Sequence, residues 1–153
     1  MSERTEQEAL FDFLSRMEGR YPLLQRVLHI ANEASGGGGK VRTAYQRKDG
    51  SLGYRMTPVE AMTNARMGVK KGAWDIWAPF RNRAPIWECP AGIFVGCAIE
   101  MKARGGRLSP DQEAWGAFLC SEGWSCTVCY DWTSAAQLLI RWVGGDPDEI
   151  EGL

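Results

Sequence analysis

Glu100, Met101 and Lys102 close an apolar run that begins near Ile93 and has the composition of a β-strand. Side chains alternate between the two faces of a strand, so Glu100 and Lys102 leave its end on the same face. An acid and an amine in this arrangement most commonly form a solvated ion pair. A minority of such pairs take part in catalysis, and a third group is needed to distinguish the two cases.

Asp75 supplies that third group. It lies in the segment GAWDIW, at the start of the preceding predicted strand, and a hairpin between the two strands would bring it near Glu100. Two carboxylates can hold Mg²⁺ or Mn²⁺ together with a substrate phosphate. Such a cation polarises the phosphoryl group and activates water, and an adjacent lysine can stabilise the negative charge that develops. These residues indicate phosphate ester hydrolysis.

Helix signals surround this pair of strands. Leu10, Phe13, Leu14 and Met17 recur at the spacing of one buried helical face, which predicts a helix over residues 3–17 with Thr5 and Glu8 as its capping box. Thr57 and Pro58 predict the start of a second helix that ends near Gly68, and a third begins at Ser109-Pro110 and continues to about Glu122. A last helix is expected over residues 134–143.

The remaining strands are expected at LLQRVLHI, after Pro22, and at SCTVCYD, residues 125–131. The order of elements predicts an α/β fold with a central mixed sheet flanked by helices. We expect one domain over residues 1–145, with a flexible glycine-rich basic loop or hairpin at 35–56 and a loose acidic tail at 146–153. The GGGGK segment in that loop lacks the spacing of a phosphate-binding P-loop.

Charge is distributed unevenly along the chain. Residues 38–107 contain 13 Lys and Arg against five Asp and Glu, whereas both flanking segments are acidic, and the net charge is −1. A basic middle segment is either a solvated surface or a footprint for a polyphosphate.

The cysteines and the apolar segments indicate the compartment. Cys126 and Cys129 are spaced as a CxxC but fall on opposite faces of a predicted strand, and the single histidine, His29, offers no complement for a zinc site. Five reduced cysteines suit the cytoplasm. We expect no signal peptide and no membrane span.

Together these motifs resemble one nuclease family. GVKKGAWDIWAP (68–79), FVGCAIEMKARGGRLSPDQEAW (94–115) and EGWSCTVCYDWTSA (122–135) resemble the virus-type replication-repair nuclease domain, VRR-NUC, of the PD-(D/E)xK superfamily. Glu3-x-x-x-Gln7 and HIAN at 29–32 also fit its pattern. Two positions depart from it, because Trp74 and Ala31 stand where the family usually has proline.

The resemblance implies a restriction-endonuclease-like core and roles for individual residues. Asp75, Glu100 and the backbone carbonyl of Met101 would be metal ligands, and Lys102 would be the water-activating base or a stabiliser. Glu3 would be an accessory acid at the metal, with Glu6 and Glu8 as competitors, and Gln112 would approach from the third helix, although it also fits a capping box with Ser109. Supporting and DNA-binding roles would fall to further residues: Gln7, Asn32, Lys70, Lys71, Arg104 and Arg107.

The function expected from this resemblance is a Mg²⁺- or Mn²⁺-dependent endonuclease that cuts branched DNA, such as four-way junctions, and leaves 5′-phosphate and 3′-hydroxyl ends. Stand-alone domains of this kind are associated with phages, so we expect the cytoplasm of a bacterial or phage-infected cell. The resemblance and the small size of the chain also imply a homodimer. Two alternatives stay open. One is a non-catalytic DNA-binding module of the same fold, and the other is a sequence-specific, restriction-like endonuclease that would use residues 35–56 for recognition.

Overall fold

The computed structural model describes residues 2–30, 40–58, 70–86 and 89–150. The chain divides into two compact units, one made of residues 1–30 and 72–153 and the other of residues 31–71. The first unit contains the predicted catalytic strands. Among the described residues, no helix combines the length and the apolar composition that crossing a membrane requires.

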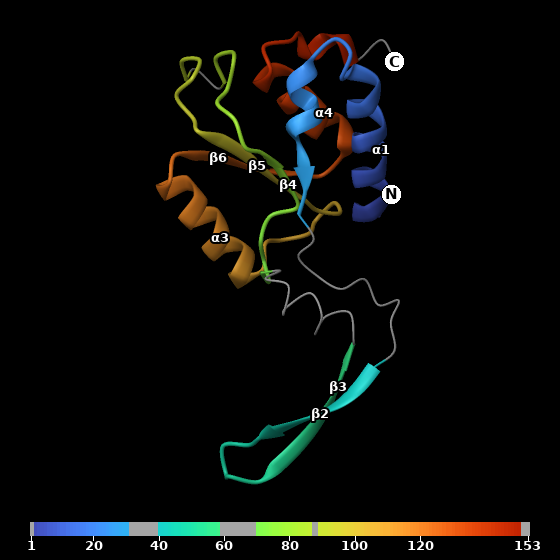
Figure 1. The fold of residues 1–153 in the computed structure, drawn as a ribbon, viewed down its shortest axis with the longest axis vertical. Coiled ribbons are helices and arrows are strands. Elements are labelled where there is room, and N and C mark those ends of the chain that lie inside the picture. The colour runs from blue at the N-terminus through green and yellow to red at the C-terminus, as the bar shows by residue number, and fades with distance from the viewer. Residues whose placement is uncertain (1, 31–39, 59–69, 87–88, 151–153) are drawn as a thin grey trace. The chain divides into compact units, whose positions relative to one another are not determined.

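A four-stranded mixed sheet forms the centre of the first unit (Figure 1). Its strand order is β1 (Leu28–His29), β4 (Ile76–Ala78), β5 (Gly96–Met101) and β6 (Trp124–Cys129). β4 pairs antiparallel with β1 and β5, while β5 and β6 are parallel. The expected hairpin between the strands of Asp75 and Glu100 is confirmed, because Ile76 lies opposite Ile99.

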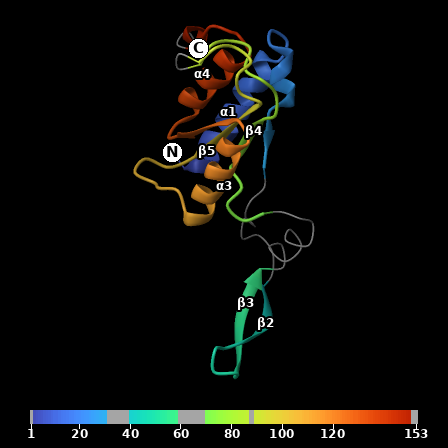
Figure 2. The same ribbon diagram turned by 90° about the vertical axis from the view of Figure 1, so that its left-hand side faces the viewer.

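Helices cover both faces of this sheet. On one face, α1 (Glu3–Met17) and α4 (Trp132–Trp142) pack together, and the main core forms around Leu10, Leu14 and Trp142. On the other face lies α3 (Pro110–Ser121), whose Leu119 packs with Trp74 and Ala98. Figures 1 and 2 show α3 and the α1–α4 pair on opposite sides of the strands. All six residues of β5 are buried as a result.

The cysteines follow this layering. Cys129 belongs to the core beneath α1 and α4, whereas Cys126 packs with the cluster beneath α3. The two residues therefore face opposite sides of β6, as the strand periodicity predicts. Every cysteine is a free thiol.

Several element boundaries expected from the sequence are wrong. Residues 22–26 form a 3₁₀ helix, η1 (Pro22–Arg26), and only Leu28 and His29 are a strand. Proline favours the start of a helical turn, since its ring sets φ and its missing N–H would have no partner there. Ser2, rather than Thr5, caps α1 by accepting a hydrogen bond from the Thr5 amide. α4 begins two residues earlier than expected, because Asp131 is its N-cap.

The second unit contains an antiparallel ribbon of β2 (Lys40–Gln46) and β3 (Leu52–Pro58). The prediction that Thr57 and Pro58 open a helix is wrong, because they pair with Val41 and Lys40 at the end of β3. Proline is compatible with the end of an edge strand, where its missing N–H removes no ladder bond. The rest of that predicted helix lies outside the described residues.

The expectation of a loose acidic tail is wrong over residues 147–150. These residues form the short helix η2 (Pro147–Ile150), and the Ile150 side chain is buried. Glu149 accepts hydrogen bonds from the Arg20 guanidinium at 2.6 Å and from the Tyr21 hydroxyl at 3.1 Å. One apolar side chain and one ion pair thus hold this segment on the first unit.

Candidate active site

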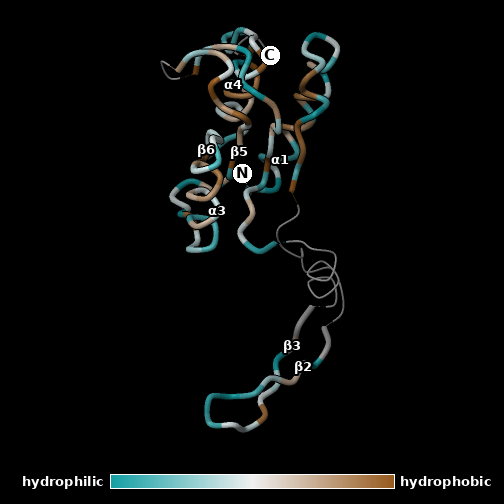
Figure 3. The backbone as a smooth tube through the Cα atoms, turned by 60° about the vertical axis from the view of Figure 1, so that its left-hand side comes forward, coloured by the Kyte–Doolittle hydropathy of each residue, from teal (hydrophilic) through white to brown (hydrophobic). Residues whose placement is uncertain are grey.

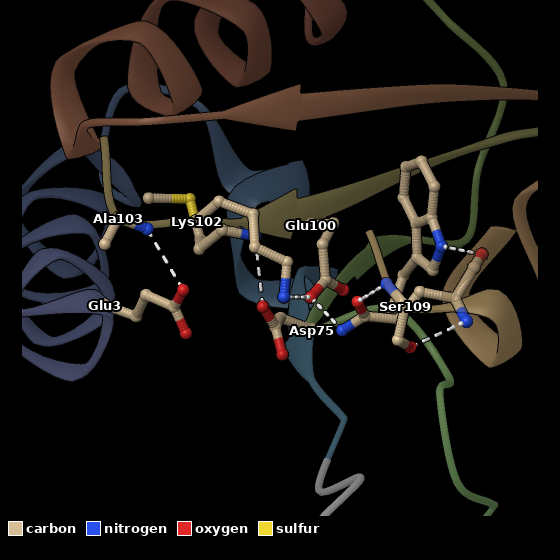
Figure 4. Close-up of polar contacts among 9 residues, drawn as sticks. Glu3, Asp75, Glu100, Lys102, Ala103 and Ser109 are labelled. Carbon is tan, nitrogen blue, oxygen red and sulfur yellow. Dashed lines mark hydrogen bonds and ion pairs between the residues drawn. The ribbon is translucent and has the colours of Figure 1, made fainter. Parts of the chain in front are cut away.

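Asp75 lies immediately before β4, where two backbone contacts hold its segment in place. Its carbonyl accepts a hydrogen bond from the Ile30 amide at 2.7 Å, and its Oδ2 accepts one from the Met101 amide at 3.0 Å. The second bond joins the predicted acid to the end of β5 (Figure 4). Only 8% of Asp75 is exposed, so its carboxylate lies within the fold, beside the end of β5.

Glu100 is the most deeply buried acid of the described chain, with 1% of its surface exposed. Its Oε1 lies 2.9 Å from Nζ of Lys102 and also accepts a hydrogen bond from Nε2 of Gln112. Among the described residues, no group bonds to its Oε2, which is also buried. A buried carboxylate oxygen without a partner is costly, so this oxygen is suited to an additional ligand.

Gln112 is held from three sides. Its backbone N–H donates to Ser109 Oγ, and its side-chain Oε1 accepts from the Ser109 backbone N–H. Its backbone carbonyl accepts from Trp74 Nε1 at 2.8 Å. The capping box and the site role were alternatives in the sequence, and the structure shows that one side chain serves both. Oε1 completes the cap while Nε2 reaches Glu100 (Figure 4).

The N-terminal acids lie in different places. Glu3 accepts a hydrogen bond from the Ala103 amide at 3.0 Å, one residue beyond Lys102. Glu6 is buried and accepts from the Trp132 amide at 2.9 Å, so it stabilises the start of α4. Glu8 forms an exposed pair with Arg4. Glu3 is therefore the one of these three acids that contacts the end of β5.

Two further predicted residues are less informative. Gln7 lies one turn along α1 from Glu3 and is partly exposed. Asn32 lies outside the described residues.

Burial and charge determine the protonation of this cluster. Burial, followed by the nearby charge of Asp75, raises the pKa of Glu100 to about 7. Burial alone would lower the pKa of Lys102, but its bond to Glu100 and the charges of Glu100, Glu3 and Asp75 outweigh that effect and raise it. Lys102 is consequently an ammonium at neutral pH, which favours the role of charge stabiliser over that of base.

The donor set is compatible with a hard cation that also binds substrate. Within the described part of the chain, no group of three or more His, Cys, Asp or Glu side chains is arranged to hold a metal. Asp75 and Glu100 provide two carboxylates, and Glu100 Oε2 is a buried oxygen without a hydrogen-bond partner. Mg²⁺ characteristically binds through one or two carboxylates and completes its shell with water and phosphate. The residues present fit that pattern.

The basic residues expected to contact DNA lie in two places. Arg104 and Arg107 are exposed on the turn that follows Lys102, where Gly105 has a φ of 83° and the Gly106 amide donates to the Ala103 carbonyl. The charge of Arg104 also acts on Asp131. Lys70 and Lys71 are exposed and belong to the second unit, at its junction with Gly72.

Trp74 has a role that the sequence did not reveal. Its buried ring lies against α3 at Gly116, where an added Cβ would be 2.7 Å from the Trp74 Cζ2 atom. Together with the bond from Nε1 to Gln112, this contact seats α3 beside Asp75. The one available signal was a glycine in the middle of a predicted helix, since such a residue commonly marks a close approach.

Comparisons with known proteins agree with the geometry. The family model described as the VRR-NUC domain matches residues 61–132, which include Asp75, Glu100, Lys102 and Gln112. No curated protein matches the chain in sequence. A solved structure titled "VRR_NUC domain protein" superimposes with a TM-score of 0.60 over 95% of this chain and 92% of that one, at 18% sequence identity. Residues 61–132 thus match the VRR-NUC family, and the chain shares the fold of a protein that carries this domain.

Proposed function

We propose that this protein is a metal-dependent endonuclease that hydrolyses phosphodiester bonds in DNA. The observation that carries the proposal is the convergence of Asp75, Glu100 and Lys102 at the ends of two paired strands, within a domain of nuclease-type fold. Glu100 Oε2, buried and without a bonding partner in the described chain, adds a site for a cation.

Mg²⁺ or Mn²⁺ is the proposed cofactor. Asp75, Glu100 and the backbone carbonyl of Met101 would hold it. When bound, such an ion polarises the phosphoryl group and lowers the pKa of water.

The side chains around the carboxylates have separable tasks. Lys102, held as an ammonium beside Glu100, offers a positive charge to the phosphate as negative charge develops during attack. Gln112 holds the Glu100 carboxylate from the α3 side. Glu3 holds the Ala103 amide and so restrains the backbone next to Lys102.

Hydrolysis at this site would add water across the bond between phosphorus and the 3′-oxygen. The water oxygen forms the new bond to phosphorus, the bond to the 3′-oxygen breaks, and the leaving oxygen takes a proton. The products are a 5′-phosphate and a 3′-hydroxyl. Arg104 and Arg107, exposed beside Lys102, would contribute affinity through the DNA backbone, as would Lys70 and Lys71.

The preferred substrate that we propose is branched DNA, such as a four-way junction, cut by a homodimer that applies one site to each of two strands. Support for this finer proposal comes from the resemblance to stand-alone VRR-NUC domains. A non-catalytic DNA-binding module is less well supported, because Asp75, Glu100 and Lys102 are all present and lie together.

The decisive experiment incubates the protein with labelled four-way junction, flap, single-stranded and linear duplex DNA in Mg²⁺, Mn²⁺ or EDTA. We expect cleavage of the junction only with metal, and a loss of about 100-fold or more in Lys102→Ala, the usual effect of removing one transition-state charge stabiliser. Mass spectrometry of the products checks for 5′-phosphate ends.

Other outcomes have clear meanings. Cleavage of linear duplex at one sequence would replace the junction proposal with the restriction-like one. DNA binding without cleavage under either metal would leave the binding module. Arg16→Ala, an exposed change on α1, serves as the control for nonspecific loss of activity.

A further inference from the structure

The ribbon of β2 and β3 has features that the proposed active site does not explain. Its register runs unbroken from Lys40 opposite Pro58 to Gln46 opposite Leu52. Seven residues per strand give a length of roughly 23 Å. The ribbon also exposes apolar side chains that a solvated hairpin would ordinarily replace with polar ones: Tyr45, Leu52, Tyr54 and Met56, at 45–64% exposure.

The turn of the ribbon is well ordered by hydrogen bonds. The Arg47 amide donates to the Ser51 carbonyl at 2.7 Å, and the Gly50 amide donates back to the Arg47 carbonyl at 2.9 Å. Asp49 accepts from both the amide and the hydroxyl of Ser51, and Gly50 takes the positive φ of 84° that closes the turn. The side chains on the ribbon are therefore displayed by a defined scaffold.

Each face of the ribbon presents an arginine beside a tyrosine. On one face, the Arg42 guanidinium lies 3.9 Å from the centroid of the Tyr54 ring. On the other face, the Tyr45 ring lies over Gly53, where an added Cβ would be 2.7 Å from Tyr45 Cζ and 3.0 Å from Arg47 Nε. An arginine and a tyrosine thus lie near each other on both sides of a two-stranded element, and on the first face the guanidinium stacks on the ring.

The ribbon is also strongly basic. Residues 40–58 contain five Lys and Arg and one Asp, a net charge of +4, so the rest of the chain carries −5. Arg42, Arg47, Lys48 and Arg55 are all exposed. Figure 3 shows hydrophilic residues at the turn and an apolar stretch on the strands.

We propose that this ribbon is a DNA-binding arm that enters a groove of duplex DNA. A two-stranded β-ribbon fits the major groove, and there both of its faces meet a wall lined with phosphates. Binding to a flat surface would use one face only, whereas here both faces carry arginine and tyrosine. The arginines would contact phosphates and the tyrosines would pack on sugars and bases. The inference rests on the proposed function in taking DNA as the partner, but it does not require catalysis.

The test measures binding of a labelled linear duplex by fluorescence anisotropy in EDTA, so that no cleavage occurs. The test variant is Arg42→Gln/Arg47→Gln/Arg55→Gln. Its control, Arg16→Gln/Arg83→Gln/Arg141→Gln, removes the same charge from exposed positions of the first unit. Affinity is followed between about 50 and 200 mM salt, because each lost phosphate contact lowers the salt dependence by about one.

The expected result is at least a tenfold loss of affinity and a salt slope shallower by about two to three in the ribbon variant, with the control close to the parent protein. Hydrogen exchange provides an independent readout. The amides of residues 40–58 should exchange more slowly when duplex DNA is added, and the free variant should match the free parent if its ribbon still forms.

The proposal is overturned if the ribbon variant keeps the parent slope, if the control loses as much, or if DNA leaves the exchange of residues 40–58 unchanged. The proposal is also overturned if the ribbon binds anionic vesicles and added duplex DNA does not displace them. Failure of the nuclease proposal is recognised separately, as ribbon-dependent binding that never leads to cleavage in Mg²⁺ or Mn²⁺.

Discussion

At the scale of single residues, the two oxygens of Glu100 have opposite environments. Oε1 bonds to Lys102 and Gln112, whereas Oε2 is buried and bonds to no described residue. Burial of the carboxyl and its proximity to Asp75 raise its pKa to about 7. A hydrogen bond donated to the ionised form of Glu100 therefore stabilises the fold more than the same bond would at a solvated site, because burial removes the water that would otherwise compensate the charge.

This arrangement predicts energetic coupling between Gln112 and Glu100. A double-mutant cycle of Gln112→Ala and Glu100→Gln, measured by urea unfolding in EDTA near pH 8, should give about 1–2 kcal/mol of coupling. In the matched cycle of Ser109→Ala and Glu100→Gln, the first change breaks only the helix cap, which contributes about 1 kcal/mol to stability. The coupling energy of this second cycle should be close to zero. Equal coupling in the two cycles would show that Gln112 acts only as part of the capping box.

At the scale of elements, the seating of α3 depends on one close contact. Gly116 lies against the Trp74 ring, and an added Cβ would be 2.7 Å from Cζ2. Alanine at this position would gain helix propensity of about 1 kcal/mol but would force the ring or the helix to move. Overpacking of this kind costs about 1–3 kcal/mol, so the cost of overpacking should exceed the gain in helix propensity.

Gly116→Ala should therefore be destabilised in urea unfolding, while the same change in a Trp74→Leu background, where the ring is absent, should be neutral or stabilising. Ala117→Gly, at an exposed position of the same helix, reports propensity alone. A Gly116→Ala protein more stable than the parent would contradict this account of how α3 is held.

The start of α4 gives a prediction about pH. Asp131 is the N-cap, and its bonds from Thr133 and Ser134 hold its pKa below the ordinary value of 3.8. Folding thus favours the ionised form, so this contribution to stability is complete well above pH 4 and is lost as the pH falls through the lowered pKa. Asparagine caps a helix without titrating.

Asp131→Asn should consequently lose stability relative to the parent at pH 6 and approach it at about pH 3. The measurement is the difference in unfolding free energy across that range. A difference that does not change with pH would mean that the charge of Asp131 contributes nothing to the cap.

At the scale of the whole molecule, a bound cation should link the site to global stability. A ligand that binds only the folded state raises the melting temperature, and above its Kd the stabilisation grows with the logarithm of its concentration. We expect Mn²⁺ or Mg²⁺ to raise the Tm of the parent protein in differential scanning fluorimetry, and EDTA to reverse the rise.

Asp75→Asn is the informative variant for this prediction, because the new amide oxygen can still accept from the Met101 amide. In EDTA it should be as stable as the parent or more so, since burial still raises the pKa of Glu100 but the charge of Asp75 no longer adds to that effect. It should fail to respond to metal. A parent protein that is insensitive to both ions at millimolar concentration would count against the metal site.

The sequence by itself determined the features that depend on short-range physics. Periodicity placed α1 at residues 3–17, a capping signature set the start of α3 with Ser109 as its N-cap, and alternation put Glu100 and Lys102 on one side at the end of β5. The antiparallel pairing that brings Asp75 to Glu100 also followed from the connection between the two strands. These features involve neighbours within a turn, a strand or one hairpin, where local geometry leaves few choices.

Tertiary structure alone decided the rest. The segment at 147–150 is held by Arg20 and Tyr21, and Glu6 accepts a hydrogen bond from the Trp132 amide at the start of α4, beside the Asp131 cap. The dual role of Gln112 and the unpartnered oxygen of Glu100 also emerge only once α3 is seated on the sheet. Each of these features depends on burial or on contacts between residues that are distant in sequence. Local propensity does not indicate which distant residues will pack against a given side chain.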